Sequence, residues 1–199
     1  MKQTVPSFLQ PGDTIGISAT ARFATAESLA IVERTITAEG FNCYYSPEIS
    51  MQHHQVAGTI AERVQHFNAL IHNPDIKAIW NVRGGYGSAE IVDLVDWDAL
   101  IAQPKWLIGF SDFTTFLCHG VQKGIATLHA PMPISFSTTH PDALTATFDV
   151  LRGKEDALHC VLPTNISGQC IAGDLRVISS IMGTPSLPRL ADRVLIIED

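Results

Sequence analysis

A serine placed for nucleophilic attack is the main chemical feature of this sequence. Ser111 comes two residues after the apolar run 106–109, and residues compatible with a helix follow it. A serine at the tip of a strand before a helix has the layout of a nucleophile elbow, which exposes the hydroxyl and directs backbone N–H groups at the attacked atom. The Gly-x-Ser-x-Gly pattern is incomplete, because Phe113 replaces its last glycine. The alternative is a serine that only caps a helix, and the residues alone leave both interpretations open.

A serine nucleophile also needs a base that removes its proton. The sequence contains eight histidines, and the last of them is His159. The chain then ends at Ile197-Glu198-Asp199. The residues alone therefore do not identify a base for Ser111, and the chemistry that they announce is incomplete.

A glycine-rich loop is the second candidate binding feature. Arg83-Gly84-Gly85-Tyr86-Gly87 follows the apolar segment 76–82, and its three glycines allow backbone N–H groups to approach a ligand closely. A tight turn before a helix is the structural alternative. A nucleotide loop is disfavoured, because the third glycine of the dinucleotide fingerprint is missing and no Gly-Lys-Ser/Thr follows. Arg83 has two interpretations, a bidentate contact to a substrate carboxylate or a salt bridge that holds the loop.

Composition narrows the class of protein. The 199 residues are 46% hydrophobic and 17% charged, which is typical of a soluble globular protein. A net charge of −7 argues against nucleic acid or anionic lipid as a partner. No apolar run is long enough for a signal peptide or a membrane span, and the four cysteines are widely spaced without a Cys-x-x-Cys pair. We therefore expect a cytoplasmic protein with reduced thiols, no membrane partner and no metal site.

Strands and helices alternate along the chain. Strands are expected at 14–19, 41–45, 76–82, 105–109 and 125–128, and helices at 25–39, from 59, at 88–95, at 113–120 and at 141–151. Thr59 and Glu62 form a capping box, and the buried face of the helix that follows is expected to carry Ile60, Val64, Phe67 and Ile71. This alternation predicts an α/β fold, a parallel sheet with flanking helices, whose ligands gather at the carboxyl ends of the strands. Ser111 and the glycine loop should therefore share one edge of the sheet.

The regular alternation of apolar strands and helices stops after residue 153, where a polar stretch begins. We expect an N-terminal α/β nucleophile domain over 1–153, a polar linker over 154–168, and the start of a truncated C-terminal domain over 169–199. A strand near Cys170, a helix over 174–182 and a strand over 193–197 make up this last block. The block is too small to enclose a core of its own.

Several segments of the chain, in order, resemble the signatures of the LD-carboxypeptidases, peptidase family S66. This family includes muramoyltetrapeptide carboxypeptidases and microcin C immunity peptidases. The matching segments are Pro11-Gly12-Asp13-Thr14-Ile15-Gly16, Val82-Arg83-Gly84-Gly85-Tyr86-Gly87, Gly109-Phe110-Ser111-Asp112-Phe113-Thr114, His129-Ala130-Pro131-Met132, Ala172-Gly173-Asp174-Leu175, Ile181-Met182-Gly183-Thr184-Pro185 and Val194-Leu195-Ile196-Ile197-Glu198-Asp199. Ala172 and Asp174 depart from the Gly and Asn that are usual in the family, which puts local substrate contacts in doubt.

The resemblance implies a Ser-Glu-His triad and an oxyanion hole. Ser111 matches the nucleophile and Glu198 the acid that orients the histidine, although the residues alone would make Glu198 a solvated carboxylate at a strand end. The backbone N–H groups of Gly85 and Asp112 match the oxyanion hole. The candidate substrate contacts are Arg83, Gly84 and Tyr86, and Tyr86 has a second interpretation as a support for the elbow; the family is compatible with either role.

None of the eight histidines matches the histidine of the family triad. In the family this residue comes from the C-terminal domain, after the motif that contains Glu198. His129 is expected to have a structural or substrate-side role and His119 a packing or surface role, and the other histidines are expected to be solvated.

The reaction that the resemblance implies is hydrolysis of the amide bond before the terminal D-amino acid of a cytoplasmic muropeptide, as in peptidoglycan recycling. It implies no metal or cofactor, and it implies a homodimer. The 199 residues alone are expected to be inactive, because the triad histidine is missing from them. Two alternatives stay open: a peptidyl-nucleotide amidase of the microcin C type, and a non-catalytic module that binds peptides or a protein partner.

Overall fold

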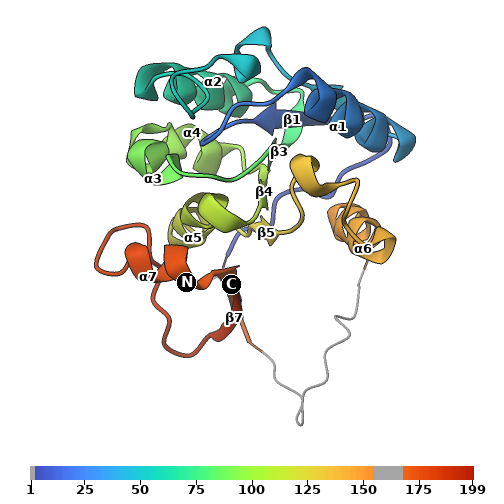
Figure 1. The fold of residues 1–199 in the computed structure, drawn as a ribbon. Helices are drawn as coiled ribbons and strands as arrows, with labels where there is room; N and C mark the ends of the chain where they lie inside the picture. Colours follow the sequence, from blue (N-terminus) through green and yellow to red (C-terminus); the bar gives the residue numbers. More distant parts are fainter. Residues whose placement is uncertain (1–2, 155–167) are drawn as a thin grey trace.

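A five-stranded parallel sheet forms the centre of the protein. The fold comes from a computed structural model that describes residues 3–154 and 168–199, so nearly all of the predicted linker lies outside the described residues. The strand order is β2-β1-β3-β4-β5, and neighbouring strands are parallel throughout (Figure 1). The strands are β1 (Thr14–Ser18), β2 (Asn42–Tyr44), β3 (Ile76–Asn81), β4 (Trp106–Gly109) and β5 (Leu128–His129). The predicted α/β fold with a parallel sheet is confirmed.

Helices cover both faces of this sheet (Figure 1). On one side lie α1 (Ala26–Ala38) and α6 (Pro141–Leu151), and on the other lie α2 (Ile60–His72), α3 (Ser88–Ile91), α4 (Trp97–Ala102) and α5 (Thr114–Gln122). Successive strand residues point to opposite faces. Trp80 and Ile108 therefore pack in the core under α1 and α6, while Ile79 and Leu107 pack in the core under the other helices. No helix in the described ranges is both long and apolar enough to cross a membrane.

Local sequence signals start and stop the two longest helices. The Thr59 side chain accepts a hydrogen bond from the Glu62 N–H, and the Glu62 carboxylate accepts one from the Thr59 N–H, so the predicted capping box is confirmed. Gly40 ends the segment of α1 with φ of +81°, a conformation that glycine adopts without strain.

The buried face of α2 differs from the prediction at its first turn. Ile60 is 44% exposed, whereas Arg63 is only 2% exposed. Phe67, Leu70 and Ile71 continue the buried face toward the other end of the helix. An arginine therefore takes the inward position that the sequence pattern assigned to an isoleucine, because polar partners meet it there.

Two other predicted elements have different bounds. The helix expected at 88–95 is a short helix, α3, followed by a single 3-10 turn at Val92–Leu94. The additional helix α4 was not predicted from the sequence, although Asp96 caps it by accepting from the Ala99 N–H. The strand expected at 125–128 forms only at Leu128–His129, since Ile125 instead makes an isolated parallel bridge to Thr4.

The residues after 168 form a small parallel pair of strands with one helix. They are β6 (Cys170–Asp174), α7 (Leu175–Ser180) and β7 (Val194–Glu198) (Figure 1). Their buried apolar side chains pack against α5 rather than around a centre of their own. Ile171, Ile178 and Ile181 share one buried cluster with Cys118 and Val121 of α5. The Asp174 N–H also donates a 3.1 Å hydrogen bond to Thr114 Oγ1, so β6 is fixed to the start of α5.

Candidate active site

Ser111 occupies a sharp turn between β4 and α5. A 3-10 turn at Ser111–Phe113 starts two residues after Gly109, the last residue of β4, and continues into α5. Ser111 has φ of +55°, in the left-handed region that L-residues rarely adopt. Ser111 is at neither N-cap position, because Phe110 precedes the 3-10 turn and Phe113 precedes α5. This backbone conformation is that of the strained strand-to-helix turn that presents a nucleophile.

The glycine loop lies directly against the Ser111 hydroxyl. A Cβ placed on Gly84 would lie 3.1 Å from Ser111 Oγ and 3.4 Å from the Met132 methyl group, so a larger residue here would crowd the serine. Gly85 and Gly87 have φ of +133° and +134°, a backbone conformation that residues other than glycine rarely adopt. The loop and the serine therefore meet at the carboxyl edge of the sheet, as expected from the strand order.

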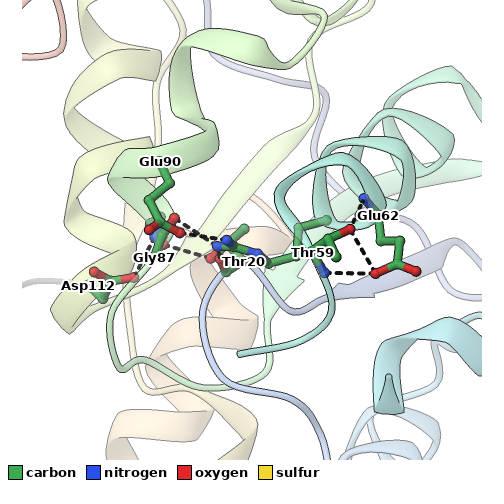
Figure 2. Close-up of polar contacts among 8 residues, drawn as sticks. Thr20, Thr59, Glu62, Gly87, Glu90 and Asp112 are labelled. Carbon is green, nitrogen blue, oxygen red and sulfur yellow. Dashed lines mark hydrogen bonds and ion pairs between the residues drawn. The ribbon is translucent and has the colours of Figure 1, made fainter. Parts of the chain in front are cut away.

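A buried arginine holds the far end of the glycine loop (Figure 2). Arg63 Nη1 donates hydrogen bonds of 2.9 Å to the carbonyl oxygens of Thr20 and Gly87. Arg63 Nη2 lies 2.6 Å from Glu90 Oε2. Thr20 follows β1 and Gly87 follows β3, so one guanidinium joins two neighbouring loops. No motif in the neighbouring sequence marks Arg63 for this contact.

The side chain of Asp112 joins the serine turn to the same loop. Its Oδ2 accepts a 3.0 Å hydrogen bond from the Ser88 N–H, at the start of α3 (Figure 2). Burial raises the pKa of Asp112 above its usual range, although the hydrogen bonds of Ser88 and the charge of Arg63 oppose this shift. The carboxylate is therefore engaged in fixing the turn, and the role predicted for Asp112 in the oxyanion hole concerns its backbone N–H.

Asn81 connects the ends of β1 and β3 beneath the loop. Its Oδ1 accepts from the Ser18 hydroxyl at 3.1 Å and from the Thr20 N–H at 3.1 Å. Its Nδ2 donates to the Arg83 carbonyl at 2.8 Å. Asn81 is fully buried at the carboxyl end of an apolar strand. That placement of an amide was the signal in the sequence that could have identified it.

Glu198 lies next to His129. Glu198 ends β7, and His129 in β5 is paired in register with Gly109 of β4. His129 Nε2 and Glu198 Oε1 are 3.8 Å apart. Burial lowers the pKa of His129 below 6.5, while the charges of Glu198 and Asp174 oppose this shift. The Glu198 carboxylate, which the sequence alone would leave in solvent, thus lies beside β5. This strand is the neighbour of β4, the strand that precedes Ser111.

The other substrate candidates differ in their surroundings. Tyr86 is 84% exposed, so it does not support the elbow, and it borders a pocket of about 760 Å³ between the glycine loop and α2. Arg83 is half-buried, and no carboxylate of the described residues forms an ion pair with it. Of its two interpretations, the salt bridge that holds the loop is therefore not observed in the described part of the chain. No group of three or more His, Cys, Asp or Glu residues within 3–154 and 168–199 is placed to hold a metal ion.

Three histidines are buried enough to affect the pH dependence of stability. His119 is in the packing role expected for it, since its ring stacks on Trp97 at 4.5 Å and its Nδ1 lies 3.0 Å from Ser186 Oγ. His66 was expected to be solvated, but it is half-buried with its Nε2 shielded from solvent, and burial lowers its pKa. Burial likewise lowers the pKa of His119 and of His129 below 6.5.

We expect the free energy of unfolding to fall as the pH drops from about 7 to about 5. In this range the unfolded chain takes up protons on His66, His119 and His129 that the folded chain resists, so acid favours unfolding. Above pH 6.5 the contribution is fully present. Urea midpoints measured along this range test the expectation, and His119→Gln should make the dependence shallower. Midpoints that are flat between pH 7 and pH 5 would contradict it.

Comparison with known proteins agrees with this geometry. The murein tetrapeptide carboxypeptidase of Pseudomonas aeruginosa is 27% identical over 96% of this chain and 67% of its own length. The microcin C7 self-immunity protein MccF of Escherichia coli is 28% identical over 100% of this chain and 71% of its own length. A structure of MccF in complex with glutamyl sulfamoyl guanosine superposes with a TM-score of 0.82 at 26% identity, covering 99% of this chain and 70% of the other.

These matches do not extend over the whole of the relatives. The chain spans about two thirds of the length of the curated relatives it matches, from 64% to 71% for four of them. The sequence model of the LD-carboxypeptidase N-terminal domain, Peptidase_S66, matches residues 15–130, which hold the glycine loop, the serine turn and His129. The chain therefore belongs to the LD-carboxypeptidase family, peptidase family S66.

Proposed function

We propose that the protein is a serine peptidase that hydrolyses the amide bond before the terminal D-amino acid of a muropeptide. The left-handed conformation of Ser111 beside Gly84 is the observation that carries this proposal. Strain at a single polar residue is retained where the surrounding structure uses it, and here the buried Asp112 carboxylate ties the turn to the Ser88 N–H. The similarity to a murein tetrapeptide carboxypeptidase supports the substrate class.

The proposed roles follow from where each group lies. Ser111 attacks the carbonyl carbon, and the backbone N–H groups of Gly85 and Asp112 stabilise the developing oxyanion. Such donors each lower the barrier by roughly 3 kcal/mol. Glu198 orients the histidine that removes the serine proton. Arg83, Gly84 and Tyr86 contact the substrate from the glycine loop, which lies against the serine.

The wider setting of the activity is part of the same proposal. We place the nucleophile domain in residues 1–153, the linker in 154–168 and the start of the C-terminal domain in 169–199. The proposed reaction belongs to peptidoglycan recycling in the cytoplasm, in a homodimer. The 199 residues alone should turn over little substrate, because the histidine that matches the family triad is not among them.

A peptidyl-nucleotide amidase is the second candidate. The similarity to MccF over the full chain, and to its complex with glutamyl sulfamoyl guanosine, supports it. The same serine, oxyanion donors and acid would act on both substrates. A third candidate, a non-catalytic binding module, would retain the fold without a reactive Ser111.

Covalent labelling tests the proposal at the level of the nucleophile. Protein expressed from the native reading frame and the 199-residue chain are each treated with a fluorophosphonate, which serine nucleophiles attack with loss of fluoride. We expect the label on Ser111 by mass spectrometry, and faster labelling in a protein that supplies the triad histidine than in the 199 residues alone. Release of D-alanine from an L,D-tetrapeptide and of the amino acid from an aminoacyl sulfamoyl nucleoside separates the two substrates.

The labelling experiment has an internal control. Ser135 is half-buried and its hydroxyl donates to the Met132 carbonyl, so it should stay unlabelled. Labelling of Ser135 to the same extent as Ser111 would mean that Ser111 has no special reactivity. D-alanine release that persists in Ser111→Ala would overturn the assignment of the nucleophile. If the 199 residues hydrolyse the peptide efficiently, His129 is the first histidine to replace, because it lies beside Glu198.

A further inference from the structure

Two arginines face a small pocket on the outer side of the glycine loop. The pocket has a volume of about 330 Å³ and is lined by Arg22, Phe23, Gln52, His54, Gln55 and Arg83. Its lining includes two guanidinium groups and no carboxylate. The chain as a whole has a net charge of −7, so the positive charge of this pocket is opposite in sign to the charge of the protein.

The Arg22 side chain is held against the backbone of the glycine loop. A Cβ placed on Gly85 would lie 2.8 Å from Arg22 Cγ and 3.2 Å from Arg22 Cδ, so the stem of Arg22 packs on the backbone of Gly85. Arg22 Nη2 donates a 2.9 Å hydrogen bond to Gln55 Oε1. The guanidinium is therefore positioned beside the residue whose N–H is proposed to bind the oxyanion.

The segments that carry the pocket are fixed by backbone hydrogen bonds. The Ala57 N–H donates to the Ala21 carbonyl at 2.8 Å, which joins the turn containing Gln55 to the residue before Arg22. His53 and Val56 close this turn with a two-residue bridge, and the Arg83 carbonyl accepts from Asn81 Nδ2. A pocket built in this way is formed before a ligand arrives.

The absence of a carboxylate partner among the described residues distinguishes these two arginines from two others in the same domain. Arg63 and Arg152 are each 2.6 Å from a carboxylate oxygen, of Glu90 and Glu39 respectively. Within the described residues, neither Arg22 nor Arg83 forms an ion pair, and their charges repel each other. In addition to burial, the charge of Arg22 lowers the pKa of Arg83, as expected for like charges that face one pocket.

We propose that Arg22 and Arg83 together bind the anionic group of the substrate that Ser111 attacks. For the identity of the ligand, the inference rests on the proposed function. An anion between two guanidinium groups relieves their repulsion and accepts bidentate hydrogen bonds. A peptide substrate would supply its terminal α-carboxylate, and a peptidyl nucleotide its phosphate or sulfamoyl group. Arg22 thereby supplies a second guanidinium group for the anion that Arg83 is proposed to bind.

Binding is measured on the 199-residue chain by NMR titration, so the test does not depend on turnover. The probes are N-acetyl-D-alanine, its uncharged amide and adenosine monophosphate. We expect N-acetyl-D-alanine to shift the Gly84 and Gly85 amide signals and the Nε–H signals of both arginines. Affinity should fall roughly tenfold in Arg22→Gln and in Arg83→Gln, because each variant removes one charge-assisted pair. The uncharged amide should bind the wild-type protein no more tightly than N-acetyl-D-alanine binds either variant.

Arg34→Gln is the matched control, since Arg34 is exposed on α1 and its loss changes the net charge equally. It should leave the titration unchanged, and the amide signals of α5 report that each variant is folded. If only adenosine monophosphate gives the arginine-dependent shifts, the pocket is supported and its anion is a phosphate. Shifts that are equal in wild type, Arg22→Gln and Arg83→Gln, or no shifts with either anion, would overturn the inference.

The labelling experiment separates this inference from the proposed function. Arginine-dependent anion binding together with an unreactive Ser111 would support the pocket and contradict the peptidase. A reactive Ser111 without arginine-dependent binding would support the peptidase and contradict the pocket.

Discussion

Replacing Ser111 with glycine should abolish substrate hydrolysis and at the same time stabilise the fold. The left-handed backbone at φ of +55° costs an L-residue about 1–2 kcal/mol, which glycine avoids. Glycine loses about 0.5–1 kcal/mol more backbone entropy on folding. The free energy of unfolding should therefore rise by roughly 0.5–1 kcal/mol, while loss of the hydroxyl lowers kcat/KM by about 10⁴-fold or more.

Ser111→Ala is the control that separates these two effects. Alanine also lacks the hydroxyl but keeps the cost of the left-handed backbone, so it should remove activity without the gain in stability. Urea unfolding of the 199-residue chain gives the stability of each variant, and D-alanine release by protein from the native reading frame gives the activity. A glycine variant that is less stable than the alanine variant would show that the turn at Ser111 is not strained.

Replacing Arg63 with methionine should lower the free energy of unfolding by about 3 kcal/mol. Methionine fills much of the volume of the side-chain stem, but it leaves the carbonyl oxygens of Thr20 and Gly87 without their donor. The glycine loop then loses its link to the loop after β1. Amide hydrogen exchange at Gly85 and Gly87 should accelerate, and activity should fall because the oxyanion donor is no longer held in place.

Glu90→Gln is the matched control for the same network. The Glu90 side chain is 54% exposed, and glutamine keeps an acceptor oxygen for Arg63, so the loss of stability should stay below about 1 kcal/mol. Urea unfolding compares the two variants directly. If Arg63→Met costs as little as Glu90→Gln, the buried guanidinium is not what fixes the loop.

Most of the architecture could be predicted because its signals are local. Helices α2 and α6 begin where a capping threonine and a proline stand in the sequence, and the strands are short apolar runs. Their alternation is enough to place Ser111 and the glycine loop at one edge of a parallel sheet. Helix α4 has only six residues, too few to show a helical period, and lies beyond the helix predicted at 88–95; its one local signal is the capping residue Asp96.

The details of the candidate site depend on contacts between distant segments. An arginine within a helix pattern does not reveal that carbonyl groups from two other loops will meet it, as they meet Arg63. Likewise, His129 and Glu198 come together only because β6 packs against α5 and β7 pairs with β6. The exposure of Tyr86 and the absence of a described carboxylate beside Arg83 are also consequences of packing.

The sequence by itself therefore determined the family, the order of the elements and the residue types of the site, because periodicity, caps and motifs are written in neighbouring residues. Tertiary structure alone decided the left-handed turn at Ser111, the partners of Arg63 and the pairing of Arg22 with Arg83. These features arise where segments far apart in the chain come into contact. A buried polar group such as Arg63 must find there a partner that its own neighbourhood in the sequence does not supply.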